Sequence, residues 1–195
     1  AMGHLYSENE QRGVFKSVDG GKSWERVLYL GPGIGVVDLV MDRSHPEILF
    51  AAAYEKTRLP WHYEAGGEGS RIYRTRDGGA SWELLSSGLP GGALGRIGID
   101  LHRANPKIVY TVIENLGRKD GGEARAEGRF DEFADQLHAN CIGGEVYRSD
   151  DGGDTWRKVS PDGLDLSGKA AYSFNEISVD PLDPDKVFLT GVAMR

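Results

Sequence analysis

Three charged residues stand at matching places in the sequence, each four positions before an aspartate. They are Asp38, Arg96 and Glu176, which precede Asp42, Asp100 and Asp180. Glycoside hydrolysis needs two carboxylates roughly 5–10 Å apart, one of them with a raised pKa. Asp38 and Glu176 are therefore candidates for a catalytic pair. Together with Arg96 they fit equally well a charged ligand site or a solvated, salt-bridged channel lining, because charges at such positions need water or partners.

A second candidate group lies in the polar, glycine-bounded segment from Glu55 to Ser70. It combines aromatic and hydrogen-bonding side chains: Arg58, Trp61, His62 and Tyr63. Aromatic rings with polar neighbours suit a sugar ring or a peptide. The alternative is that Trp61 packs the segment onto a neighbouring sheet.

The elements that must position these groups contain one motif three times: Ser/Thr-x-Asp-Gly-Gly-x-Ser/Thr-Trp at residues 17–24, 75–82 and 149–156. The aspartate can accept hydrogen bonds from the N–H groups of the next two residues, and the glycines supply positive φ. The tryptophan then starts a strand and buries its indole between sheets. The residues expected to hold these turns are Ser17, Asp19, Gly21, Trp24, Thr75, Asp77, Gly79, Trp82, Ser149, Asp151, Gly153 and Trp156.

This motif resembles the Asp box, or BNR repeat, of sialidases, sortilin-type receptors, xyloglucanases and related secreted β-propellers. A second element recurs between the boxes: alternating residues at 36–42, 95–100 and 175–180, a turn with proline, and a β-branched or aromatic run. This pattern indicates a two-stranded hairpin. The resemblance implies an all-β chain of four-stranded antiparallel propeller blades, located outside the cell or in the periplasm.

The strand pattern predicts a half blade at 13–30, blades at 36–86 and 94–160, and a half blade at 172–191. The 28 glycines and 39% hydrophobic content of this 195-residue chain fit an all-β fold with a sizeable core. Three blades would leave open sheet edges. Two alternatives follow: the chain is part of a longer propeller, or two copies form a homodimer that closes a six-bladed ring.

The long connections at 55–70 and 114–144 both join the second and third strands of a blade, so both should emerge on one face. Connections of this length are usually functional or disordered. In the second, Phe130, Phe133, Ala134 and Leu137 predict a short amphipathic helix at 129–138. Its apolar stripe would dock on the blades or contact a partner.

Composition excludes several classes of function. A net charge of −7 argues against binding nucleic acid, and the sequence lacks an apolar run long enough to insert in a membrane. The single cysteine, Cys141, permits no internal disulfide and no zinc cluster. The boxes lack the distal glutamate of calcium loops, so we expect no metal and no cofactor.

Three functions therefore remain. The chain could bind a glycan or peptide through the face with the long connections, act as a glycoside hydrolase or part of one, or serve as a structural propeller that assembles with another chain. An arginine triad of the sialidase type cannot be assigned, nor can the catalytic aspartates of xyloglucanases.

Overall fold

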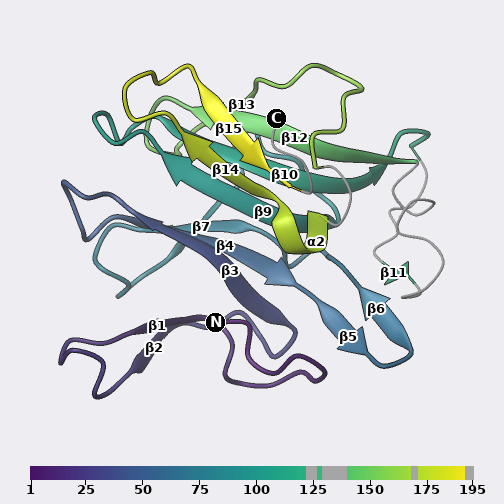
Figure 1. The fold of residues 1–195 in the computed structure, drawn as a ribbon. Helices are drawn as coiled ribbons and strands as arrows, with labels where there is room; N and C mark the ends of the chain where they lie inside the picture. The colour runs from purple at the N-terminus through teal and green to yellow at the C-terminus, as the bar shows by residue number, and fades with distance from the viewer. Residues whose placement is uncertain (122–126, 129–139, 168–170, 192–195) are drawn as a thin grey trace.

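The structure, a computed structural model, describes residues 1–121, 127–128, 140–167 and 171–191 (Figure 1). The helix predicted at 129–138 lies outside the described residues. The all-β prediction is confirmed, since the described part of the chain consists of antiparallel sheets and one helical turn.

Two four-stranded sheets form the centre of the molecule. The first has the order β3-β4-β7-β8 and the second the order β9-β10-β12-β13. Their strands are β3 (Ile34–Met41), β4 (Leu49–Glu55), β7 (Ile72–Thr75), β8 (Glu83–Leu85), β9 (Leu94–Leu101), β10 (Val109–Arg118), β12 (Cys141–Ser149) and β13 (Arg157–Lys158). Each sheet runs from its first strand to its last in chain order, as in a propeller blade.

A two-stranded sheet flanks each of these blades. One pairs β1 (Val14–Lys16) with β2 (Glu25–Leu28), and the other pairs β14 (Glu176–Val179) with β15 (Val187–Thr190). The strand expected to begin at residue 172 begins at Glu176, because residues 171–174 form a helical turn, α2 (Ala171–Phe174). The N–H of Asn175 bonds to the carbonyl of Ala171 at 3.3 Å and ends that turn.

The described parts of the two long connections meet at one end of the molecule (Figure 1). The first contains a hairpin, β5 (Thr57–Leu59) and β6 (His62–Glu64), and the second contributes β11 (Glu127–Gly128), which pairs with β6. The predicted limits of the second connection were too wide, because β10 and β12 continue to pair as far as Arg118 and Cys141. We call this end, with both connections, the insertion face.

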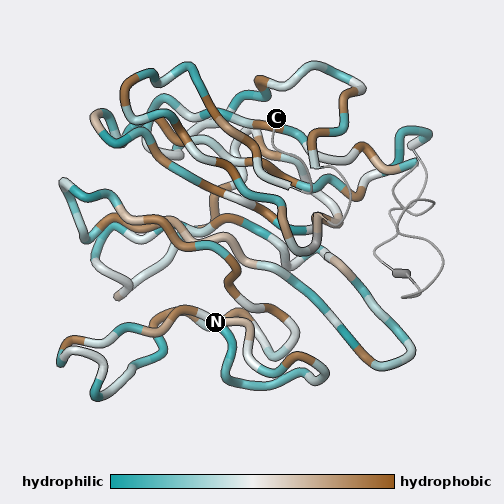
Figure 2. Tube along the Cα trace, in the orientation of Figure 1, coloured by the Kyte–Doolittle hydropathy of each residue, from teal (hydrophilic) through white to brown (hydrophobic). Residues whose placement is uncertain are grey.

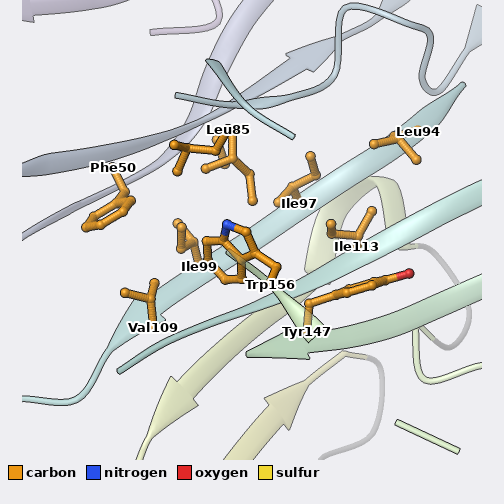
Figure 3. Close-up of a cluster of buried hydrophobic side chains, with 11 residues drawn as sticks. Phe50, Leu85, Leu94, Ile97, Ile99, Val109, Ile113, Tyr147 and Trp156 are labelled. Carbon is orange, nitrogen blue, oxygen red and sulfur yellow. The ribbon is translucent and has the colours of Figure 1, made fainter. Parts of the chain in front are cut away.

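Apolar side chains fill the spaces between neighbouring sheets. Figure 2 shows hydrophobic residues concentrated in the stacked strands, whereas the β5–β6 hairpin is largely hydrophilic. One cluster joins the two complete blades, with Phe50 and Leu85 from the first against Ile99 and Trp156 from the second (Figure 3). Two further clusters join the flanking sheets to these blades. Each sheet is therefore stabilised by the next one.

The box tryptophans differ in burial because they differ in the apolar clusters that they contact. Trp156 is 6% exposed between the two complete blades, and Trp82 packs against the cluster that joins the first blade to the β1–β2 sheet. Trp24 is 63% exposed. The prediction that all three indoles are buried is wrong for Trp24, which lines a hollow between the first and second Asp boxes.

The Asp-box turns have the predicted positive φ angles but a different hydrogen-bond pattern. In the second box, the Asp77 carboxylate accepts bonds from the hydroxyls of Thr75 at 2.7 Å and Ser81 at 2.6 Å and from the Ser81 N–H at 2.9 Å. The N–H of Gly79 bonds to the Thr75 hydroxyl at 2.9 Å, so the carboxylate does not bind the glycine N–H groups as expected. The boxes at Asp19 and Asp151 repeat this arrangement. These bonds lower the pKa of both carboxyls to about 2.

A basic residue directly before each box reaches toward the next blade. Lys16 donates to the carbonyl of Gly78 at 2.8 Å, and Arg74 donates to the carbonyl of Gly152. Arg74 also binds Glu83 at 2.6 Å and Asp154 at 2.5 Å, with its side chain 4% exposed. The box of one blade is thereby fastened to the third strand of the preceding blade.

Removing the Arg74 side chain should loosen this contact. We expect Arg74→Gln to lower the free energy of unfolding by about 1–3 kcal/mol, because the Gly152 carbonyl and two carboxylates lose a charged donor. Arg76→Gln is the matched control, since Arg76 shares the same two carboxylates but is 56% exposed, and it should cost under about 0.5 kcal/mol. Urea denaturation of both variants measures the difference, and equal losses would contradict a specific role for Arg74.

Removing a box carboxylate should reduce stability rather than activity. Asp77→Ala is expected to lower the melting temperature by several degrees, because two hydroxyls and one N–H lose their acceptor. Asp162→Ala is the control, since its carboxylate is exposed and pairs with Lys158. A melting temperature that stays unchanged in Asp77→Ala would show that the carboxylate does not hold the turn.

Candidate functional site

The innermost strands β3, β9 and β14 bring Asp38, Arg96 and Glu176 close together. Arg96 Nη2 lies 3.5 Å from Glu176 Oε1. The charges of Arg96 and Glu176 both act on the carboxyl of Asp38. The side chain of Glu176 is 60% exposed and that of Arg96 is 16% exposed, so the group opens to solvent through Glu176.

The predicted equivalence of these three positions is wrong by two residues at Arg96. The ladder places Asp38 opposite Ala52 and Glu176 opposite Thr190, and the corresponding residue of β9 is Gly98, opposite Val112. The turn after each innermost strand shows why. The backbone N–H groups of Asp42 and Asp180 each donate to the carbonyl six residues later, and in the turn after β9 this donor is His102 rather than Asp100. Arg96 nevertheless lies within reach of Glu176.

Asp38 links two innermost strands through its carboxylate. Its Oδ2 accepts a bond from the N–H of Ile99 at 3.0 Å, and its Oδ1 accepts one from the N–H of Leu39 at 2.9 Å. Asp100, which the sequence analysis did not single out, repeats this link to Val179 at 2.8 Å. Burial raises the pKa of Asp38, while the two N–H bonds oppose that shift. Of the candidate pair, Glu176 is thus the carboxylate that a ligand can approach.

A buried polar layer lies behind this group. Glu114 on β10 is 1% exposed, and its Oε2 accepts a bond from the N–H of Arg96 at 3.2 Å. Burial raises the pKa of Glu114 to about 8, and the charge of Asp165 contributes to that shift. Tyr54 on β4 is also 1% exposed, and burial with the adjacent Tyr63 and Glu114 raises its pKa. The layer connects β4, β6, β9 and β10.

The β5–β6 hairpin carries the second candidate group. Trp61 at its turn is 75% exposed, so the alternative that it packs against a blade is wrong. His62 Nε2 lies 3.0 Å from Glu64 Oε1. The Arg58 guanidinium is 5.6 Å from the centre of the Tyr6 ring, and Tyr63 points its ring toward Lys56, whose Nζ is 5.7 Å away. The hairpin therefore offers an open indole beside hydrogen-bonding groups.

Sequence reasoning missed four residues of this site: Arg12, Tyr54, Lys56 and Glu114. Glu114 left a signal, because it is an acid within an otherwise apolar strand pattern, VYTVIEN. Arg12 left none, since it lies in an N-terminal segment without periodicity and reaches the site through the fold.

Within the described ranges, no cluster of three or more His, Cys, Asp and Glu side chains is arranged to hold a metal. The helical part of the described structure contains no segment that is long and apolar enough to span a membrane.

Comparison with known proteins agrees with the propeller-blade fold. Residues 147–158 match the BNR/Asp-box repeat family. Among solved structures, the chain is similar to the GH74 xyloglucanase from Xanthomonas campestris, with a TM-score of 0.58, 17% identity, and coverage of 96% of this chain and 24% of that one. It is also similar to the GH74 enzyme from Niastella koreensis, with a TM-score of 0.57, 18% identity, and coverage of 95% and 24%.

An ancestral GH74 enzyme gives a third match, with a TM-score of 0.53, 18% identity, and coverage of 94% of this chain and 19% of that one. None of the curated proteins matches the sequence. The chain spans about a quarter or less of the length of these enzymes, and identities this low establish the propeller fold alone.

Glu114 should make stability depend on pH. Its folded pKa of about 8 exceeds the value of about 4.3 expected in the unfolded chain, so the unfolded state releases the proton first as pH rises. The contribution of Glu114 to stability is complete below about pH 4.3 and is lost as pH rises toward 8. We expect Glu114→Gln to remove this loss.

Urea denaturation at pH 5 and pH 8 tests this expectation. The difference in unfolding free energy between the two pH values should shrink in Glu114→Gln. It should persist in Glu68→Gln, whose side chain is exposed. The same pH dependence in the wild type and Glu114→Gln would show that Glu114 is not the responsible group.

Proposed function

Because the chain is an Asp-box protein built of β-propeller blades, we propose that it is a binding module that recognises a glycan on its insertion face. An extracellular or periplasmic location, which the resemblance implies, is part of the same proposal.

The observation that carries this proposal is the arrangement of both candidate groups on one face. The β6–β11 ladder joins the two long connections there. Tyr63 of the hairpin neighbours Tyr54, and Tyr54 in turn lies within the electrostatic influence of Arg96. Arg96 in turn pairs with Glu176, the first residue of β14. Aromatic and charged groups thus follow one another from the hairpin to the innermost strands.

This arrangement provides the contacts that a sugar chain requires. The exposed indole of Trp61 offers an apolar face for a pyranose ring. Glu176, Arg96 and the His62–Glu64 pair supply donors and acceptors for hydroxyl groups. A peptide could use the same groups. The carboxylate of Glu176, which pairs with Arg96, and the His62–Glu64 pair suit a ligand with many hydroxyls better.

A second candidate function is glycoside hydrolysis. Asp38 and Glu176 both lie beside Arg96, and burial raises the pKa of Asp38, as a general acid requires. Against this role, both oxygens of Asp38 already accept backbone N–H groups. Xyloglucan, the substrate class named for the Xanthomonas enzyme, is the first polysaccharide to test for either function.

A glycan array that includes xyloglucan oligosaccharides tests the binding proposal. Trp61→Ala is expected to weaken binding of any glycan found by about fivefold or more, because a stacking surface worth about 1 kcal/mol or more is lost. Trp24→Ala is the matched control, since Trp24 is also exposed but lies in an Asp box away from the hairpin. Equal effects of the two substitutions, or no binding to any glycan, would overturn the proposal.

Hydrolysis assays on the same oligosaccharides separate the two functions. Turnover that Glu176→Gln abolishes would favour the enzyme, whereas binding without turnover would favour the module. An assembly role, in which a homodimer closes a six-bladed ring, is a separate hypothesis. Size-exclusion chromatography with mass detection at several concentrations tests it.

A further inference from the structure

Four basic side chains gather at the base of the β5–β6 hairpin: Arg12, Lys56, Arg58 and Arg96. Arg12 Nη1 donates to the carbonyl of Lys56 at 3.2 Å. The charges of all three arginines act on the Lys56 ammonium and, after burial, are the main causes that lower its pKa. Positive charge is therefore concentrated on one face of a chain whose net charge is −7.

Two of these cations form no ion pair with a described residue. Arg12 is 3% exposed, and its guanidinium donates to the neutral carbonyls of Ser7, Gly33 and Lys56, while its Nε has no hydrogen-bond partner among the described residues. Lys56 is half-buried, and its ammonium faces the Tyr63 ring. Partly buried charges without a counterion are costly, so the cluster favours an anion.

The carboxylates that the structure describes near the cluster do not balance it. Both oxygens of Asp38 accept backbone N–H groups, and Glu176 pairs with Arg96. Glu114, with a pKa of about 8, is mostly protonated at pH 7. Glu8 is exposed, and its charge favours the charged form of Arg12. The two side chains do not form an ion pair. An excess of positive charge remains beside the aromatic rings of the hairpin.

We infer that this basic cluster binds the carboxylate of an acidic sugar, a uronic acid residue of a glycan. The inference rests on the proposed glycan-binding function and names the ligand class of that site. Lys56, which is half-buried, is the contacting group, and the charges of Arg12, Arg58 and Arg96 strengthen the positive potential around it. The ring of Tyr63 beside the Lys56 ammonium, on the hairpin that also carries the exposed Trp61, favours an anion carried on a sugar over a bare inorganic anion.

Isothermal titration calorimetry with trigalacturonate and triglucuronate, each compared with its methyl ester, tests this inference. The esters keep the ring and the linkage but lack the charge. We expect at least one acid to bind about tenfold or more tightly than its ester. Lys56→Met should remove most of that preference, and Lys56→Arg should retain it. Lys22→Met, which removes an exposed lysine in the first Asp box, should leave it unchanged.

Two outcomes would overturn the inference while the proposed function stands: binding of neutral glycans alone, or equal binding of acids and esters. Absence of binding by acidic and neutral glycans alike would instead defeat the proposed function as well. Thermal stabilisation by sodium sulfate equal to that by the uronates would show a general anion site and overturn the sugar assignment. If Lys56→Met does not fold, Arg58→Gln takes its place under the same criteria.

Discussion

Each sheet of this chain has two apolar faces, and only a neighbouring sheet can remove them from water. The cluster that contains Phe50 and Trp156 is shared between the two complete blades, so neither blade has a core of its own. Burial between sheets is therefore the interaction on which the rest of the structure depends. It also explains why equivalent residues differ in environment. Trp156 is enclosed between two sheets, whereas Trp24 belongs to none of the described apolar clusters and is 63% exposed.

Polar contacts set the spacing that this packing needs. The Asp-box turns direct the outer strands, and the basic residue before each of the first two boxes binds the next box along the chain. At the inner edge, the carboxylates of Asp38 and Asp100 accept N–H groups that an open sheet edge would otherwise expose. The outer and inner strands of neighbouring blades are both held in this way.

On the insertion face, charged side chains that lack an ion-pair partner among the described residues replace the apolar contacts that stabilise the blades. Arg12 and Lys56 gather positive charge there without carboxylates from the described part of the chain to pair with them, and Glu114 lies buried behind them with its pKa raised. A fold stabilised by apolar contacts elsewhere can tolerate this cost locally. Such costs are typical of surfaces that bind a ligand, because the ligand supplies the missing counterion.

The sequence by itself determined the repeating architecture. Asp-Gly-Gly turns and alternating strands are local patterns, governed by hydrogen bonds and φ angles within a few residues, so the all-β fold and the shared face of both insertions could be predicted. Tertiary structure decided the composition of the site. The register that separates Arg96 from its predicted place depends on a turn around His102, and Arg12 reaches Lys56 only through contacts between segments 44 residues apart. The exposure of Trp24 and the burial of Glu114 and Tyr54 likewise depend on which sheet lies next to each residue. Sequence patterns of a few residues carry no information about that neighbouring sheet.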